Sequence, residues 1–211
     1  MRYSKVLGIL AVSLFCAAGC TVGEGQGEVK SDHLMVNNCW AGTFDLGPTF
    51  FAANAFSTDQ LSIRVQRGDN TQEVSDGLEV SIRDLQKVRS SSLGKAIDVG
   101  LPPGVSPPGA RWPGDANPPQ VSLALYLHDT CHAQNGAIYA VRGTITFKKL
   151  FSGNSNETSG DARLTDATFS AYFGDPRDAA VDGTFDDAKL SEVHGWFRFY
   201  FQRGQPAQPF P

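Results

Sequence analysis

The densest group of chemically reactive side chains lies in the stretch His128-Asp129-Thr130-Cys131-His132. Imidazole, thiolate and carboxylate groups can together hold a transition metal. Covalent haem attachment is excluded, because it needs a CxxCH motif and the first position here is His128. The two histidines would share a face only on a helix, yet they follow a strand-like run. The alternative to a metal site is a disulfide from Cys131, and the cysteine count given below favours it.

A second group of potential ligands is the acidic stretch 161–187, which carries seven Asp residues. Calcium requires several oxygen ligands that converge on one point. Starting from Asp178, the twelfth position of an EF-hand loop would be Lys189 instead of Glu. A looser site around Asp175, Asp178 and Asp182 is an alternative, but Asp-rich turns between strands explain the composition more simply. We therefore predict no metal and no cofactor.

The motifs of common catalytic machineries are missing from the chain. It contains no GxSxG, no HExxH and no phosphate-binding GxxxxGK[ST] motif. With four His residues in the whole sequence, general bases are few. We therefore predict no catalytic residues and expect that the protein is not an enzyme.

Three aromatic side chains are candidates for stacking on a ligand: Trp112, Trp196 and Tyr200. Trp112 lies in a loop rich in proline and glycine. Trp196 and Tyr200 alternate with phenylalanines, so we expect them on the outward face of a strand. An aromatic ring with an apolar body beside polar hydrogen-bonding groups suits a sugar. These three residues form the candidate ligand-binding set.

The N-terminus has the pattern of an export signal. Arg2 and Lys5 precede a largely apolar run at residues 6–15, which is too short to span a bilayer as a stable helix. Small residues at 17–19 then precede Cys20, and this stretch resembles the lipobox of bacterial lipoproteins, although Ala17 stands where that family prefers Leu. The resemblance implies that residues 1–19 are a signal peptide and that Cys20 is lipidated. Cleavage of an ordinary secretory signal is the alternative.

The cysteine count agrees with lipidation. Cys16 falls within the signal peptide, which leaves Cys20, Cys39 and Cys131. An unpaired thiol is unfavourable in an oxidising compartment, and lipidation of Cys20 leaves two cysteines that can pair. We therefore predict a Cys39–Cys131 disulfide. The chain-entropy model gives such a bridge about 4 to 5 kcal/mol of stabilisation.

The composition of the chain and its expected cellular location limit the kinds of partner that it can bind. A formal charge of −4 excludes a basic nucleic-acid binder, and 41% hydrophobic residues exclude a disordered chain. The lipobox resemblance implies a protein of the cell envelope, held at a membrane by its lipid. Thr21, and not Asp, follows Cys20; in Gram-negative sorting this favours the outer membrane over the inner one. The expected partners are that membrane and an unknown envelope protein or glycan.

The rest of the chain divides into three parts. Residues 20–38 show no periodic apolar pattern and alternate glycines with Glu24 and Gln26, so we expect a lipidated N-terminus and a flexible tether. Residues 39–203 are expected to form the folded domain, and residues 204–211 a Pro-rich tail. Within the domain, the stretch 101–119 holds seven prolines, which predicts a long surface loop.

From Cys39 onward the apolar pattern repeats every second residue, as in a strand with one buried and one solvent-exposed face. The clearest runs are Leu61, Ile63 and Val65; Leu78, Val80 and Ile82; Leu123, Leu125 and Leu127; and Phe197, Phe199 and Phe201. A helical period is limited to residues 83–89. The sequence therefore predicts an all-β fold: a single antiparallel β-sandwich or barrel with short strands, one long Pro/Gly-rich loop and little helix.

These features favour a membrane-anchored envelope lipoprotein with a non-catalytic structural or protein-binding role. A carbohydrate- or small-ligand-binding β-sandwich is the alternative, and a hydrolase is less favoured. The body of the chain looks like envelope lipoproteins of no assigned activity. The resemblance therefore implies a cellular location and does not indicate a biochemical activity.

Overall fold

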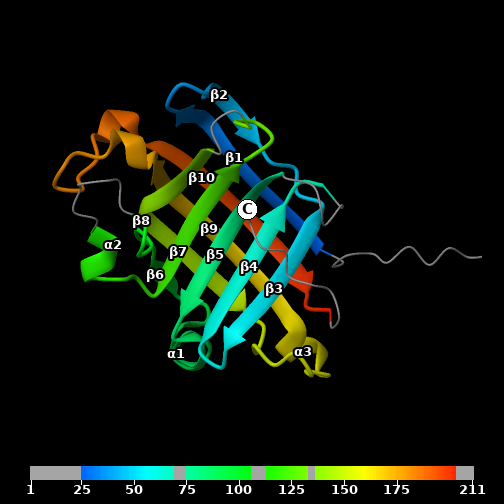
Figure 1. The fold of residues 1–211 in the computed structure, drawn as a ribbon. Helices are drawn as coiled ribbons and strands as arrows, with labels where there is room; N and C mark the ends of the chain where they lie inside the picture. The colour runs from blue at the N-terminus through cyan, green and yellow to red at the C-terminus, as the bar shows by residue number, and fades with distance from the viewer. Residues whose placement is uncertain (1–24, 69–74, 106–112, 133–135, 203–211) are drawn as a thin grey trace, which may run out of the picture.

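The computed structural model describes residues 25–68, 75–105, 113–132 and 136–202, and within them the chain forms one antiparallel sheet. The strand order is β2-β1-β10-β9-β8-β7-β5-β4-β3, and the short β6 pairs with β8. Figure 1 shows the sheet curled into a half-barrel, with β3, β4, β5 and β7 in front of β9 and β10. The predicted all-β class is confirmed. The strands are β1 Gly25–Val36, β2 Trp40–Asp45, β3 Phe50–Ser57, β4 Gln60–Gln66, β5 Asp76–Arg83, β6 Ala96–Asp98, β7 Val121–Leu127, β8 Gly136–Lys149, β9 Leu164–Gly174 and β10 Ser191–Tyr200.

The helical elements are single turns between strands. They are α1 Leu85–Lys87, the π-helical turn η1 Val88–Ser92, α2 Pro113–Ala116, α3 Gly160–Arg163 and the 3₁₀ turns η2 Pro176–Asp178 and η3 Asp187–Lys189. In the described ranges, none of these helices has the length and apolar character needed to cross a membrane. The turns α1 and η1 overlap the stretch 83–89, where a helical period was expected. The predicted loop contains α2, whereas Trp112 lies outside the described residues.

The core fills the space between the two halves of the curled sheet. The inward side chains of β4, β5 and β7 meet those of β9 and β10, and all of the apolar members are buried. Phe197 and Phe199 are inward, and the Phe199 ring stacks on Phe51 of β3 with 5.9 Å between the ring centroids. Trp196 and Tyr200 point outward, as the alternation predicted.

Strand β1 corrects the prediction of a flexible tether at 20–38. Gly25–Val36 forms a strand that pairs with β10 on one side and with β2 on the other. A β-carbon added to Gly25 would lie 2.5 Å from the Phe51 ring, and one added to Gly27 would lie 3.0 Å from it. The alternating glycines therefore form the inward face of a strand, where Phe51 occupies the space that side chains would need. The folded domain includes Gly25–Val36, and residues 20–24 lie outside the described ranges.

The expectation that the outer face of β4 and β7 is exposed to solvent is wrong. Arg64, Gln66, Ser122 and Ala124 occupy the positions that the alternation assigned to solvent, yet all four are buried. The alternation correctly separates the two faces of each strand. It does not specify what packs over either face, because that depends on contacts between distant parts of the chain.

Candidate functional site

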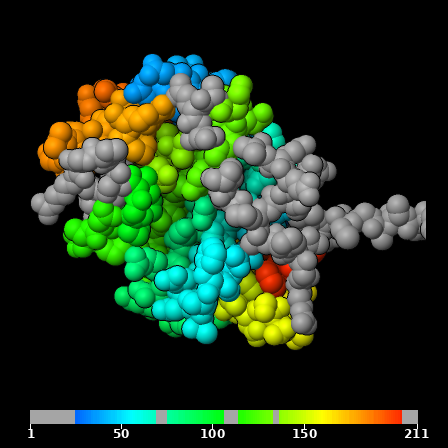
Figure 2. All heavy atoms as spheres, in the orientation of Figure 1, coloured from blue at the N-terminus to red at the C-terminus, as the bar shows by residue number. Residues whose placement is uncertain are grey.

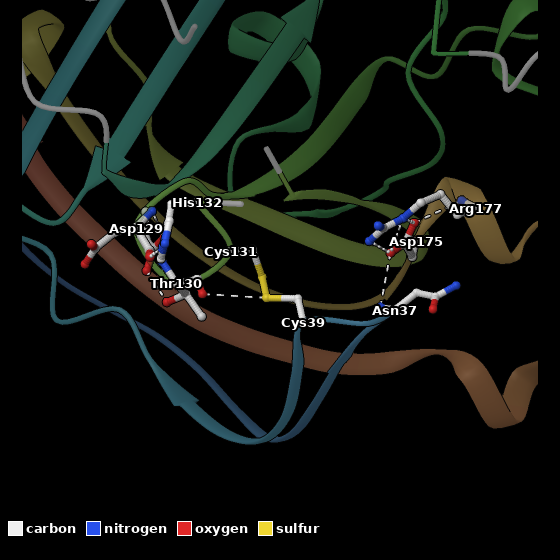
Figure 3. The surroundings of a disulfide bond; sticks show 9 residues. Asn37, Cys39, Asp129, Thr130, Cys131, His132, Asp175 and Arg177 are labelled. Atoms are coloured by element: carbon white, nitrogen blue, oxygen red, sulfur yellow. Dashed lines mark hydrogen bonds and ion pairs between the residues drawn. A yellow bond between two sulfur atoms is a disulfide. The ribbon is translucent and has the colours of Figure 1, made fainter. Parts of the chain in front are cut away.

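The predicted Cys39–Cys131 disulfide is present. It joins the turn between β1 and β2 to the turn that follows β7, as Figure 3 shows. The second turn is held by the buried carboxylate of Asp76, whose Oδ1 accepts hydrogen bonds from the backbone N–H groups of Asp129 at 2.9 Å and Thr130 at 3.0 Å. A buried carboxylate with several donors stabilises one backbone conformation. Asp76 and the disulfide together therefore position this end of the half-barrel.

The disulfide also bears on the metal-site alternative at His128 and His132. The sulfur of Cys131 is bonded to Cys39, so it is not available as a thiolate ligand. His128 is buried, and its ring stacks on that of Tyr126 with 5.5 Å between the centroids. Within the described residues, no three His, Cys, Asp or Glu side chains are grouped so as to hold a metal ion.

The acidic stretch forms capped turns and ion pairs. Asp175 is buried, caps η2 and accepts hydrogen bonds from the backbone N–H and the guanidinium Nε of Arg177, both at 2.9 Å. This hydrogen-bonded carboxylate raises the pKa of Arg177. The second Asp175 oxygen accepts the backbone N–H of Asn37, so the β1–β2 turn, blue in Figure 2, packs beside the orange segment that follows β9. Asp182 instead accepts hydrogen bonds from Thr184, so it serves a local turn.

Trp196 and Tyr200 lie together on the outer face of β10, with Arg198 between them. They remain 39% and 41% exposed, respectively. Four residues of strand separate the two rings by about 13 Å along β10. We call these three side chains, with Tyr172 of the neighbouring strand β9, the aromatic face. Tyr172 is exposed, and the guanidinium carbon of Arg142 lies 4.8 Å from the centroid of its ring.

Polar side chains surround the aromatic face. The strand register places Gln26 of β1 and Asp166 of β9 on either side of Arg198. A hollow of about 430 Å³ opens beside Arg198 and Tyr200, and Gln26 also lines it. Exposed rings beside amide, carboxylate and guanidinium groups can stack on an apolar ligand surface and bond to its polar edge. The structure thus brings Trp196 and Tyr200 together on one surface, whereas Trp112 falls outside the described residues.

A second cluster was missed by sequence reasoning because its positions were assigned to solvent. On the outer face of the front half of the sheet, Arg64 and Glu79 are paired in register on β4 and β5. Burial lowers the pKa of Arg64 to about 10. Burial and, secondarily, the charge of Glu79 raise the pKa values of Tyr126 and Tyr139. Side chains with shifted pKa values are concentrated at binding and catalytic sites, and they also occur in structural networks.

Serine hydroxyls complete this cluster. The Oγ atoms of Ser62 and Ser81 donate to the Glu79 carboxylate, at 2.8 Å and 3.3 Å. The sequence does contain serine, arginine and glutamate at outward positions of consecutive strands. Their assembly depends on the strand register, which the sequence alone does not reveal.

Comparison of the chain with models of known protein families, with curated proteins and with solved structures found no match in any of the three.

Proposed function

We propose that the protein is a lipid-anchored, non-catalytic module of the bacterial envelope that binds a glycan through its aromatic face. The observation that carries the proposal is the shared outward exposure of Trp196 and Tyr200 on β10, with Arg198 between them. Two partly exposed aromatic rings on the same face of a regular strand offer apolar surface on which a ligand can stack.

A sugar fits the chemistry of this face better than an apolar partner does. The C–H face of a pyranose can stack on an indole or phenol ring. Gln26, Arg198 and Asp166 supply donors and acceptors for its hydroxyl groups. The spacing of about 13 Å between the two rings suits a chain of sugar units over a single one. The proposal therefore specifies a polysaccharide.

Binding of the full-length protein in detergent to peptidoglycan sacculi and to a panel of soluble polysaccharides tests the proposal. Trp196→Ala and Tyr200→Ala should each weaken binding about two- to tenfold, since an aromatic contact contributes about 0.5 to 1.5 kcal/mol. Trp40→Ala is the matched control, because Trp40 is 38% exposed but lies on β2. Absence of glycan binding, or equal binding by all variants, would refute the proposal.

The anchor is tested separately. We propose that Cys20 carries the lipid, as the resemblance to a lipobox implies, and that the destination is the outer membrane, because Thr21 follows Cys20. The intact mass of the protein from its native host should show a chain that begins at Cys20 and carries acyl groups. Cys20→Ser should release the protein from membranes or stall its processing. An unmodified mature chain would contradict this part of the proposal.

A further inference from the structure

A hollow of about 370 Å³ opens where β4, β5 and β7 run side by side, within the usual range for small-molecule sites. We propose that this hollow, the serine pocket, binds an acidic monosaccharide of the uronate class. The ligand carboxylate would lie on Arg83 and the ring hydroxyls along three serines. The described residues that line the pocket include Phe56, Ser62, Ser81, Arg83, Pro102 and Ser122.

The three serines form a straight row across the sheet. Ser62 of β4 is the register partner of Ser81 of β5, and Ser81 is the register partner of Ser122 of β7. Neighbouring strands lie about 4.8 Å apart, so the row spans about 10 Å. Ser62 and Ser81 give their protons to Glu79. Their free lone pairs can therefore accept hydrogen bonds from the hydroxyl groups of a ligand.

Ser122 supplies an independent indication of a ligand. Its side chain lines the pocket although the residue is only 8% exposed. Among the described residues, no group forms a hydrogen bond with its hydroxyl, unlike the hydroxyls of the other two serines. The hydroxyl is therefore open to the pocket and can both donate a hydrogen bond to a ligand and accept one from it.

The other lining residues specify an acidic sugar. Arg83 is the charged residue among the described lining residues, and in that part of the chain its guanidinium forms no ion pair. Its backbone N–H bonds to the carbonyl of Gln120 at 2.9 Å, which fixes the end of β5 beside the start of β7. A guanidinium binds a carboxylate in a bidentate fashion. Phe56, which is 67% exposed, and Pro102 offer apolar surfaces for the C–H face of the ring.

The serine pocket lies on β4, β5 and β7, whereas the aromatic face lies on β9 and β10. A uronate in the pocket does not require a polysaccharide on the aromatic face. Variants of the two surfaces therefore test the two proposals separately.

Calorimetric titration of the full-length protein in detergent with D-glucuronate and D-galacturonate, and with the neutral sugars D-glucose and D-galactose, tests the inference. At least one uronate should bind saturably and more tightly than its neutral counterpart. Arg83→Gln should weaken uronate binding about ten- to a hundredfold, the range for a hydrogen bond to a charged group, and abolish the preference over the neutral sugar. Lys149→Gln removes one surface charge outside the pocket and should leave the affinity unchanged.

Ser122→Ala keeps the backbone and removes only the hydroxyl. It should weaken uronate binding severalfold while preserving the preference for the acid. Thermal melts of each variant confirm that the fold is retained. The inference is overturned if neither uronate binds, if the neutral sugar binds equally well, or if folded Arg83→Gln and Ser122→Ala proteins bind as the wild type does.

Discussion

Two adjacent residues of β10, Phe199 and Tyr200, should respond very differently to replacement by alanine. Phe199 is 1% exposed, stacks on Phe51 and lies 6.5 Å from Phe197 between ring centroids. Tyr200 points to the other side of the strand and is 41% exposed. Because the two positions share the same strand and the same flanking sequence, their difference reports the orientation of β10 directly.

The size of the effect follows from the buried area. A buried aromatic side chain removes about 150 to 250 Å² from water. At about 25 cal/mol per Å² this corresponds to about 4 to 6 kcal/mol. The remaining methyl group and a compact unfolded chain reduce the figure, and core Phe→Ala changes cost about 3 to 5 kcal/mol. Tyr200→Ala removes a partly exposed ring, so we expect about 1 kcal/mol, the span of strand propensities.

Urea unfolding followed by circular dichroism measures both variants, and thermal melts provide a second readout. For a domain of this size the midpoint shifts by about 2 to 4 °C per kcal/mol. Phe199→Ala should therefore melt about 6 to 20 °C below the wild type, and Tyr200→Ala about 2 to 4 °C below it. If Tyr200→Ala lowers the unfolding free energy as much as Phe199→Ala does, or more, the assignment of Tyr200 to an exposed face of β10 is wrong, and so is the aromatic face.

Three further measurements test other parts of the structure. Reduction of the Cys39–Cys131 bridge, which spans 92 residues, should lower the unfolding free energy by about 4 to 5 kcal/mol; alkylation of both thiols in unreduced protein would contradict the bond. Gly195→Ala places a β-carbon 2.1 Å from a carbonyl oxygen of β1 and should cost about 1 to 3 kcal/mol in thermal melts. Gly160→Ala, with nothing within 4 Å, is its control, and an equal loss would refute the argument. Burial, as the main cause, raises the pKa of Tyr126, so its phenol stays protonated in the folded state. In the unfolded chain the same phenol ionises above about pH 10. The stability that Tyr126 contributes is therefore fully present below that pH and is lost as the pH rises further. Tyr126→Phe should make the free energy of unfolding, measured in urea melts, fall less steeply with pH in this range. An unchanged dependence on pH would count against burial of the ring.

Local patterns in the chain were sufficient for the class of fold and for parts of the site. The pleat of a strand turns every second side chain to the same face, so Phe197 and Phe199 could be assigned to the core and Trp196 and Tyr200 to the outside. The disulfide followed from counting cysteines, once Cys20 was set aside for lipid.

Patterns of the same kind led to a wrong prediction at β1. Alternating glycines have high conformational freedom, and the sequence around Gly25 and Gly27 was therefore interpreted as a tether. The strand forms because Phe51, which is distant in the sequence, fills the inward side that the glycines leave open. No local sequence pattern predicts the contact between Phe51 and these glycines, because it forms only when the sheet curls.

The sequence by itself thus determined the alternation of faces, the pairing of Cys39 with Cys131 and the exposure of the aromatic pair on β10. Only the tertiary structure decided the strand order, the burial around Arg64 and the alignment of three serines in one row. The physical reason is the range of the interactions involved. Alternation depends on the geometry of consecutive residues, whereas register and coverage depend on which strands become neighbours when the chain closes its long loops.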